Sequence, residues 1–123
     1  MMNKIFLAGN LGVDPQLKVT NSDKEVCNFT LATRGWRKSD DGNNDTTTWH
    51  SITAWGSQAK YASNYLQKGD ECLIEGRIEY QTYTDQNGVK KNKTIVIANT
   101  IKGFKKKAPN EKVIEVSEDD IPF

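Results

Sequence analysis

The sequence predicts a small all-β barrel with one short helix and an acidic C-terminal tail. Five segments are rich in β-branched and aromatic residues, as strands are. They are residues 3–9, 25–38, 47–56, 71–85 and 91–104. Turn-forming clusters separate them, and one intervening stretch has helical periodicity instead. Beyond the last strand, residues 113–123 carry four acidic side chains and no basic one.

Loop compositions mark where the strands end. Residues 20–23 and 40–44 are typical of turns, because Asn, Asp, Ser and Gly tolerate turn conformations. Asn87-Gly88 lies between two alternating runs and is the strongest short hairpin signal in the sequence. The last two strands are therefore expected to pair as a hairpin.

One helix is expected between the third and fourth strands. Ser57 can cap its N-terminus, and Gly69 can stop it. Between them Ala59, Ala62 and Leu66 share one face. Five strands with a helix in this place give the element order of an OB-fold barrel over residues 1–104, although another small barrel could have the same order.

Composition indicates an ordinary globular chain. Its 123 residues are 36% hydrophobic and 27% charged, which suits one domain with a short appendage. No apolar run approaches the ~18 residues of a membrane span, and the N-terminal apolar run is too short for a signal peptide. The expectation is a cytoplasmic protein with no membrane partner.

The sequence predicts no enzyme, no metal site and no cofactor. Cys27 and Cys72 lie apart among apolar strand residues, so buried reduced thiols are expected. His50 is the only histidine and falls on the apolar parity of its strand. Tyr80 falls on the apolar parity of the fourth strand in the same way. Both residues are therefore expected to make a core or subunit contact. Catalysis would need a metal cluster, a His/acid pair or a Cys/His pair, so we expect no catalytic residue.

Alternation along the strands places four aromatic rings on the polar side of the predicted sheet, because successive side chains face opposite sides. Trp36 falls opposite the apolar positions of the second strand. Trp49 and Trp55 share the parity of Thr53 in the third strand, and Tyr83 falls opposite the apolar set of the fourth. All four rings are therefore expected to be exposed.

Exposed rings on a polar surface suit the stacking of unpaired bases, and each base contributes on the order of 1–3 kcal/mol. OB-folds also bind oligosaccharides with such rings, so a sugar ligand is an alternative. Cations distributed around the rings favour a phosphate-bearing ligand. The candidate phosphate contacts are Lys4, Arg34, Arg37, Lys68, Lys90, Lys91 and Lys93.

The acidic tail, expected to be disordered, ends in an apolar anchor. Pro122 restricts Ile121 to extended conformations, and Phe123 follows beside the terminal carboxylate. This tip suits a basic-rimmed pocket on another protein. The tip spans residues 117–123, with Asp119, Asp120, Ile121, Pro122 and Phe123 as its binding residues. Residues 105–116 form a short linker that spans roughly 20 Å as a flexible coil.

Several motifs together resemble the bacterial single-stranded DNA-binding proteins. They are Asn3 to Gly12 with Asp14-Pro15, Asn28 to Thr33 with Trp36, Thr48-Trp49-His50 with Trp55-Gly56, Tyr65 to Gly69, Ile74-Glu75-Gly76, and Asp119 to Phe123. The similarity covers residues 2–104 and the last few residues.

This resemblance implies an OB-fold subunit, usually a homotetramer, that coats single-stranded DNA in replication, recombination and repair. It implies base stacking on Trp36, Trp49, Trp55 and Tyr83, and a nucleoid-associated location. It also implies that the acidic tip docks DNA-processing enzymes and can compete with DNA.

Three departures from the family pattern carry expectations of their own. Ser51 and Ser57 stand where relatives often carry a basic residue. Glu79 and Gln81 also replace basic residues. With fewer basic side chains, the protein would displace fewer counterions from DNA, so a shallow salt dependence of DNA affinity is expected. Because the linker is short, partners are expected to dock close to the DNA face. Two alternatives stay open, an OB-fold primosome or accessory adaptor and an RNA-binding OB protein.

Overall fold

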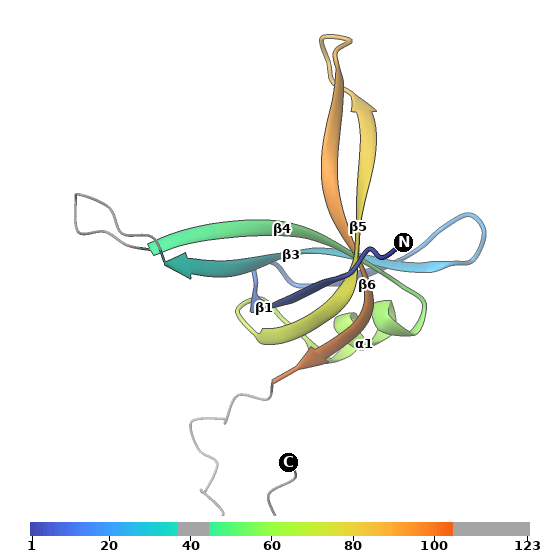
Figure 1. The fold of residues 1–123 in the computed structure, drawn as a ribbon. Helices are drawn as coiled ribbons and strands as arrows, with labels where there is room; N and C mark the ends of the chain where they lie inside the picture. The colour runs from blue at the N-terminus through green and yellow to red at the C-terminus, as the bar shows by residue number, and fades with distance from the viewer. Residues whose placement is uncertain (37–44, 105–123) are drawn as a thin grey trace, which may run out of the picture.

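Six strands and one helix make up the fold in the computed structural model, which describes residues 1–36 and 45–104 (Figure 1). In chain order they are β1 (Ile5–Leu11), β2 (Gln16–Val19), β3 (Glu25–Trp36), β4 (Asp45–Trp55), α1 (Ser57–Tyr65), β5 (Glu71–Thr84) and β6 (Lys90–Gly103). Arg37, the linker 105–116 and the tip 117–123 lie outside the described residues, as do the side chains of Trp36 and Asp45.

Five of the strands close into a ring. The sheet runs in the order β1-β5-β6-β4-β3-β2, and β1 pairs again with β3 through Leu11 and Leu31. The ring of β1, β5, β6, β4 and β3 confirms the predicted five-stranded barrel with a helix between its third and fourth strands. Only β4 and β6 pair in parallel; the other pairs of described strands are antiparallel.

The sixth strand, β2, was not predicted. It is four residues long, pairs only with β3, and leaves every side chain exposed. A strand this short carries too few residues for an alternating pattern, and its pairing depends on the edge that β3 offers.

The barrel interior follows the predicted alternation. The side chains of Cys27, Phe29 and Leu31 in β3 are buried, as are those of Cys72 and Ile74 in β5. Both cysteines are free thiols. Burial raises the pKa of the Cys27 thiol, and burial with the nearby carboxylates of Asp70 and Glu71 raises the pKa of Cys72 to about 11. Both thiols are therefore neutral at physiological pH.

The N-cap of the helix lies one residue earlier than the sequence predicts. Ser57 is the first helical residue, whereas Gly56 is the N-cap with φ of 60° and no side-chain cap bond. A positive φ favours glycine, which explains why the backbone turns there. Ala59 and Ala62 are buried as predicted, and Leu66 follows the helix as its buried C-cap residue.

Two side chains attach the helix to β6. The Gln58 Oε1 atom accepts a hydrogen bond from the Ile101 amide at 2.9 Å, and the Tyr61 hydroxyl accepts one from the Gly103 amide at 2.9 Å. These contacts hold α1 across one end of the barrel. No helix in the described residues is long and apolar enough to cross a membrane.

Two long hairpins extend from the barrel in different directions, β3–β4 and β5–β6 (Figure 1). The β5–β6 turn contains the predicted Asn87-Gly88 pair, with Gly88 at φ 77°. The Asp85 carboxylate accepts hydrogen bonds from the Asn87 and Val89 amides at 2.9 Å each. Those amides, together with Lys91, hold the pKa of Asp85 below its usual value.

Candidate nucleic-acid interface

The register between β3 and β4 brings two tryptophans to one face. Ala32 pairs with Trp49, and Val26 pairs with Trp55, so both rings lie on the outward side of these strands. Trp49 is 61% exposed and Trp55 is 43% exposed, which confirms the predicted exposure. The two residues are six positions apart, roughly 20 Å along an extended strand. The backbone of Trp36 continues the same parity at the end of β3.

The surface between the two tryptophans is polar and nearly uncharged. Thr30 pairs with Ser51, and Asn28 pairs with Thr53, whose hydroxyl donates to the side-chain Oδ1 atom of Asn28 at 2.8 Å. Among the described outward side chains of β3 and β4, Arg34 alone carries a charge. This floor can accommodate a planar base without repelling a phosphate.

The same outward face continues onto the second hairpin. Thr53 pairs with Ile97 of β6, and two positions earlier Ile95 has the same orientation. Both isoleucines are nearly buried, so the junction between the two hairpins has an apolar floor. Farther along, Tyr83 pairs with Lys91 on this parity and is 48% exposed. The structure therefore places Tyr83 on the continuation of the surface that carries Trp49 and Trp55.

The predicted phosphate contacts do not all lie on one surface. Lys91 and Lys93 share the outward parity with Tyr83, whereas Lys90 pairs with Thr84 on the opposite side of the hairpin. Lys91 also forms a salt bridge with Asp85 at 3.3 Å. Arg34 is exposed on the β3–β4 face.

The other two described residues of the predicted phosphate set, Lys68 and Lys4, lie elsewhere. The Lys68 amide donates to the Asp14 carboxylate at 2.7 Å, beside the connection between β1 and β2. Lys4 forms an ion pair with Glu75, which holds the pKa of that carboxyl below its usual value, chiefly through the hydrogen bond from Lys4. Since Glu75 pairs with Phe6, Lys4 lies by the β1–β5 surface and not by the aromatic face.

The two residues expected at core or subunit contacts differ in their surroundings. His50 is partly buried, and its Nε2 atom lies 2.8 Å from the Thr33 hydroxyl. Tyr80 is 75% exposed, so the core alternative is wrong for that residue. Tyr80 lies in the second half of β5, where each residue from Glu79 to Thr84 is exposed.

Gly12 belongs to the site and was missed from the sequence. A Cβ atom at this position would lie 2.5 Å from the Trp49 Cζ3 atom and 2.5 Å from the Thr30 hydroxyl. The Gly12 amide donates to the Thr30 carbonyl at 2.9 Å, and the Leu11 amide donates to the Asp70 carbonyl at 2.9 Å. The edge of the Trp49 ring therefore lies against a fixed backbone. Close approach of this kind is one reason for a glycine at a strand end.

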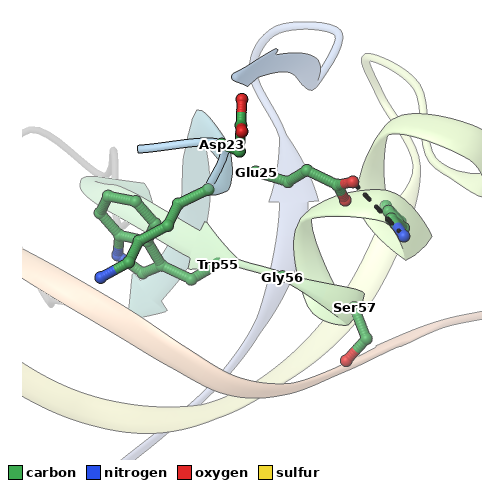
Figure 2. A pocket seen from close by; sticks show the side chains of 7 residues that line it. Asp23, Glu25, Trp55, Gly56 and Ser57 are labelled. Atoms are coloured by element: carbon green, nitrogen blue, oxygen red, sulfur yellow. Dashed lines mark ion pairs between the residues drawn. The ribbon is translucent and has the colours of Figure 1, made fainter. Parts of the chain in front are cut away.

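A cavity beside Trp55 was also missed. It has a volume of about 420 Å³ and lies between the β2–β3 turn and the start of α1 (Figure 2). Its lining residues are Asp23, Lys24, Glu25, Trp55, Gly56, Ser57 and Lys60. Lys24 and Lys60 lie far apart in the sequence, and neither belongs to a motif, so no local signal could have identified them. Among the described residues, no group of three His, Cys, Asp or Glu side chains could hold a metal ion.

Comparison with known proteins agrees with this fold. Residues 2–104 match the family described as the single-strand binding protein family. The chain belongs to that family. Its description names binding, in agreement with the prediction that the chain is not an enzyme.

Two bacterial relatives illustrate the similarity. The chain is 41% identical over 99 residues to a single-stranded DNA-binding protein of Xanthomonas axonopodis pv. citri, covering 80% of this chain and 55% of that protein. It is 43% identical over 98 residues to single-stranded DNA-binding protein 1 of Chlorobaculum tepidum, covering 78% and 60%. The chain thus spans little more than half the length of these relatives.

A solved structure shares the fold. It is the Plasmodium falciparum SSB complex with ssDNA, with a TM-score of 0.77 at 25% identity. The match covers 85% of this chain and 96% of that one. It therefore includes the barrel and is not limited to a single hairpin.

Replacing Gly12 with alanine is expected to displace the Trp49 ring, because the added Cβ would overlap Cζ3. The φ of Gly12 lies outside the left-handed region, so the effect is steric. Overpacking of this kind costs ~1–3 kcal/mol of stability. The measurement is acrylamide quenching of Trp49 in a variant that also carries Trp36→Phe and Trp55→Phe, and quenching should change on adding Gly12→Ala.

The matched control is Gly35→Ala on the β3–β4 hairpin, where the added Cβ would meet the Thr46 hydroxyl at 2.9 Å and not Trp49. It should leave Trp49 quenching unchanged. If Gly12→Ala leaves the Trp49 signal as it was, the ring does not depend on this backbone contact.

Proposed function

We propose that this chain binds single-stranded DNA without sequence preference, coats it in replication, recombination and repair, and performs no chemistry on it. The observation that carries the proposal is the pair of exposed rings, Trp49 and Trp55, on one polar face. Arg34, Lys91 and Lys93 lie along the continuation of that face. Aromatic platforms with cations beside them are how non-specific single-strand binders hold their ligand.

Stacking explains the selection of single strands. Unpaired bases offer both faces to Trp49, Trp55 and Tyr83, with Trp36 as the fourth proposed ring. A duplex hides those faces within its own stack, so it cannot use the platform. Stacking is also indifferent to base identity, because every base has a π-face.

Electrostatics supplies a smaller share of the proposed affinity. Of the cations proposed from the sequence, Arg34, Lys91 and Lys93 lie along the aromatic face, Lys68 lies at its Gly12 end, and Lys90 lies on the other side of the hairpin. Lys4 and Arg37 complete the proposed phosphate set. Each contacted phosphate releases counterions and so makes binding salt-dependent. With few such contacts, the proposed binding depends chiefly on stacking.

Replacing Trp49 with alanine should weaken binding of oligo-dT by roughly tenfold, because one stack contributes on the order of 1–3 kcal/mol. The measurement is a titration of intrinsic fluorescence at several salt concentrations, which also gives the slope of log affinity against log salt. That slope should be shallower than for strongly basic DNA binders.

Tyr65→Ala is the matched control for this titration, because Tyr65 is an exposed ring on α1, away from the aromatic face. It should leave the affinity unchanged. Oligo-rU in a parallel titration tests the RNA-binding alternative, since discrimination depends on contacts to the 2′-OH. Equal affinity of wild type and Trp49→Ala for oligo-dT would contradict the stacking mechanism.

We further propose that four copies of the chain assemble. Phe6 and Leu73 are exposed on the outward face of β1 and β5, where Ala8 pairs with Leu73 and Phe6 lies two positions along. Exposed apolar pairs of this kind favour association between copies. Residues 1–104 carry 13 basic and 11 acidic side chains, so assembly would combine positive charge around one DNA strand.

Light scattering of the free protein is expected to give the mass of a tetramer, and Phe6→Glu should reduce it by placing charge in the apolar contact. The Tyr65→Glu variant provides the control, since it adds the same charge on α1. A monomer mass for the wild type would exclude the assembly.

The acidic tip is the proposed docking segment for DNA-processing enzymes. The supporting feature is the sequence itself, in which Asp119 and Asp120 precede an apolar Ile121-Pro122-Phe123 end. An acidic segment can occupy a basic surface, so it can also compete with DNA.

Removal of residues 119–123 should leave oligo-dT affinity equal or higher while abolishing capture of partner enzymes. Affinity capture followed by mass spectrometry, together with the fluorescence titration, measures both effects. A variant with Asp119 and Asp120 changed to Asn keeps the apolar end and isolates the role of charge. Weaker DNA binding by the truncated chain would contradict the competing role.

A further inference from the structure

The cavity beside Trp55 has walls that are fixed by backbone hydrogen bonds. In the β2–β3 turn, the Thr20 amide donates to the Lys24 carbonyl at 2.8 Å, and the Lys24 amide donates to the Thr20 hydroxyl at 3.2 Å. On the other side, the Gly56 amide donates to the Glu25 carbonyl at 2.9 Å. A ligand therefore meets a largely preformed site, which reduces the ordering cost of binding.

Trp55 connects this cavity to the aromatic face. The residue ends β4, its ring is 43% exposed, and it lines the cavity in Figure 2. It also lies on the same outward parity as Trp49. A strand that follows β4 from Trp49 to Trp55 therefore arrives at the cavity opening. A volume of about 420 Å³ falls within the range of pockets that hold small ligands.

Two lysines and two carboxylates line the cavity. Lys60 pairs with Glu25 at 3.4 Å, and the lysine side chain is 58% exposed. The other oxygen of Glu25, Oε2, is buried and has no hydrogen-bond partner among the described residues. Lys24 takes part in none of the four salt bridges found in the described part of the chain. Exposed ion pairs contribute little to stability, so a phosphate can take Lys60 from Glu25 at little cost.

A third lysine lies in line with Trp55 across three paired strands. Lys18 of β2 pairs with Val26, which in turn pairs with Trp55. The cations near Trp55 are therefore Lys18, Lys24 and Lys60, and none of them belongs to the set predicted from the sequence. The nearby carboxylates of Asp23 and Glu25 offset two of these charges. This balance suits the single charge of a phosphodiester better than the several charges of a free nucleoside triphosphate.

We propose that this cavity is a nucleotide subsite, in which a base stacks on Trp55 and the adjacent phosphodiester contacts Lys24 and Lys60. The subsite extends the path of single-stranded DNA beyond the end of β4 to the start of α1. The inference rests on the proposed function and adds its own phosphate contacts. Binding exchanges the Glu25–Lys60 ion pair for a contact between Lys60 and DNA.

The test is the salt dependence of oligo-dT affinity in the full chain. Lys24→Ala and Lys60→Ala should each make the slope of log affinity against log salt shallower by about 0.7, the value for one phosphate on a single strand. Lys24→Arg and Lys60→Arg should keep the wild-type slope, because the charge is retained. Glu25→Gln should tighten binding, because Lys60 is then unpaired.

Lys102→Ala is the matched control, because Lys102 is an exposed lysine near the end of β6 that pairs with Leu73 of β5 and does not line the cavity. It should leave the slope unchanged. If the wild type binds oligo-dT and both alanine variants keep its slope, the subsite is wrong and the proposed function stands. If the wild type does not bind oligo-dT at all, the proposed function fails and the subsite with it. Binding of free dTTP as tight as that of an oligonucleotide would also overturn the subsite.

Discussion

The antiparallel register between β3 and β4 fixes which side chains of the long hairpin reach solvent. Successive strand residues face opposite sides, so a slip of one residue would turn Trp49 and Trp55 inward and bring Ile52 outward. The fully buried side chains of Leu31 and Ile52 resist such a slip, because it would expose them to water. The aromatic face is thus held in place by the hydrophobic core on the other side of the same strands.

Closure of the barrel gives that face a rigid support. The second pairing of β1, with β3, brings the β1–β2 connection beneath the Trp49 ring, where Gly12 leaves space for it. At the other end, the β2–β3 turn and the start of α1 form the walls beside Trp55. A half-exposed ring with one fixed edge loses little conformational freedom when a base stacks on it.

Charge on this surface is sparse and partly compensated. Lys60 and Lys91 each form an ion pair with a carboxylate in the described structure. Stacking on aromatic rings is insensitive to base identity and weakly dependent on salt, whereas phosphate contacts are lost as salt rises. A surface of this composition suits a protein whose affinity comes chiefly from its rings, with cations that position the backbone of the ligand.

Much of the fold and the exposure of the rings could be predicted from the sequence, because both depend on alternation within single strands. The parity of Trp49, Trp55 and Tyr83 and the Asn87-Gly88 turn are local features of this kind, and the structure confirms them. The short edge strand β2, the glycine N-cap of α1 and the exposure of Tyr80 were decided by tertiary structure.

The remaining site residues could not be found along the chain, since they depend on contacts between distant segments. Gly12 supports Trp49 only because β1 pairs with β3, and Lys24 meets Lys60 only because the β2–β3 turn lies beside α1. Lys4 has its charge offset by Glu75 through the pairing of β1 with β5. The sequence by itself determined which face of each strand is polar and aromatic; only the closed barrel decided which of those faces, turns and charges meet, because loop closure and strand pairing bring together residues that no local pattern connects.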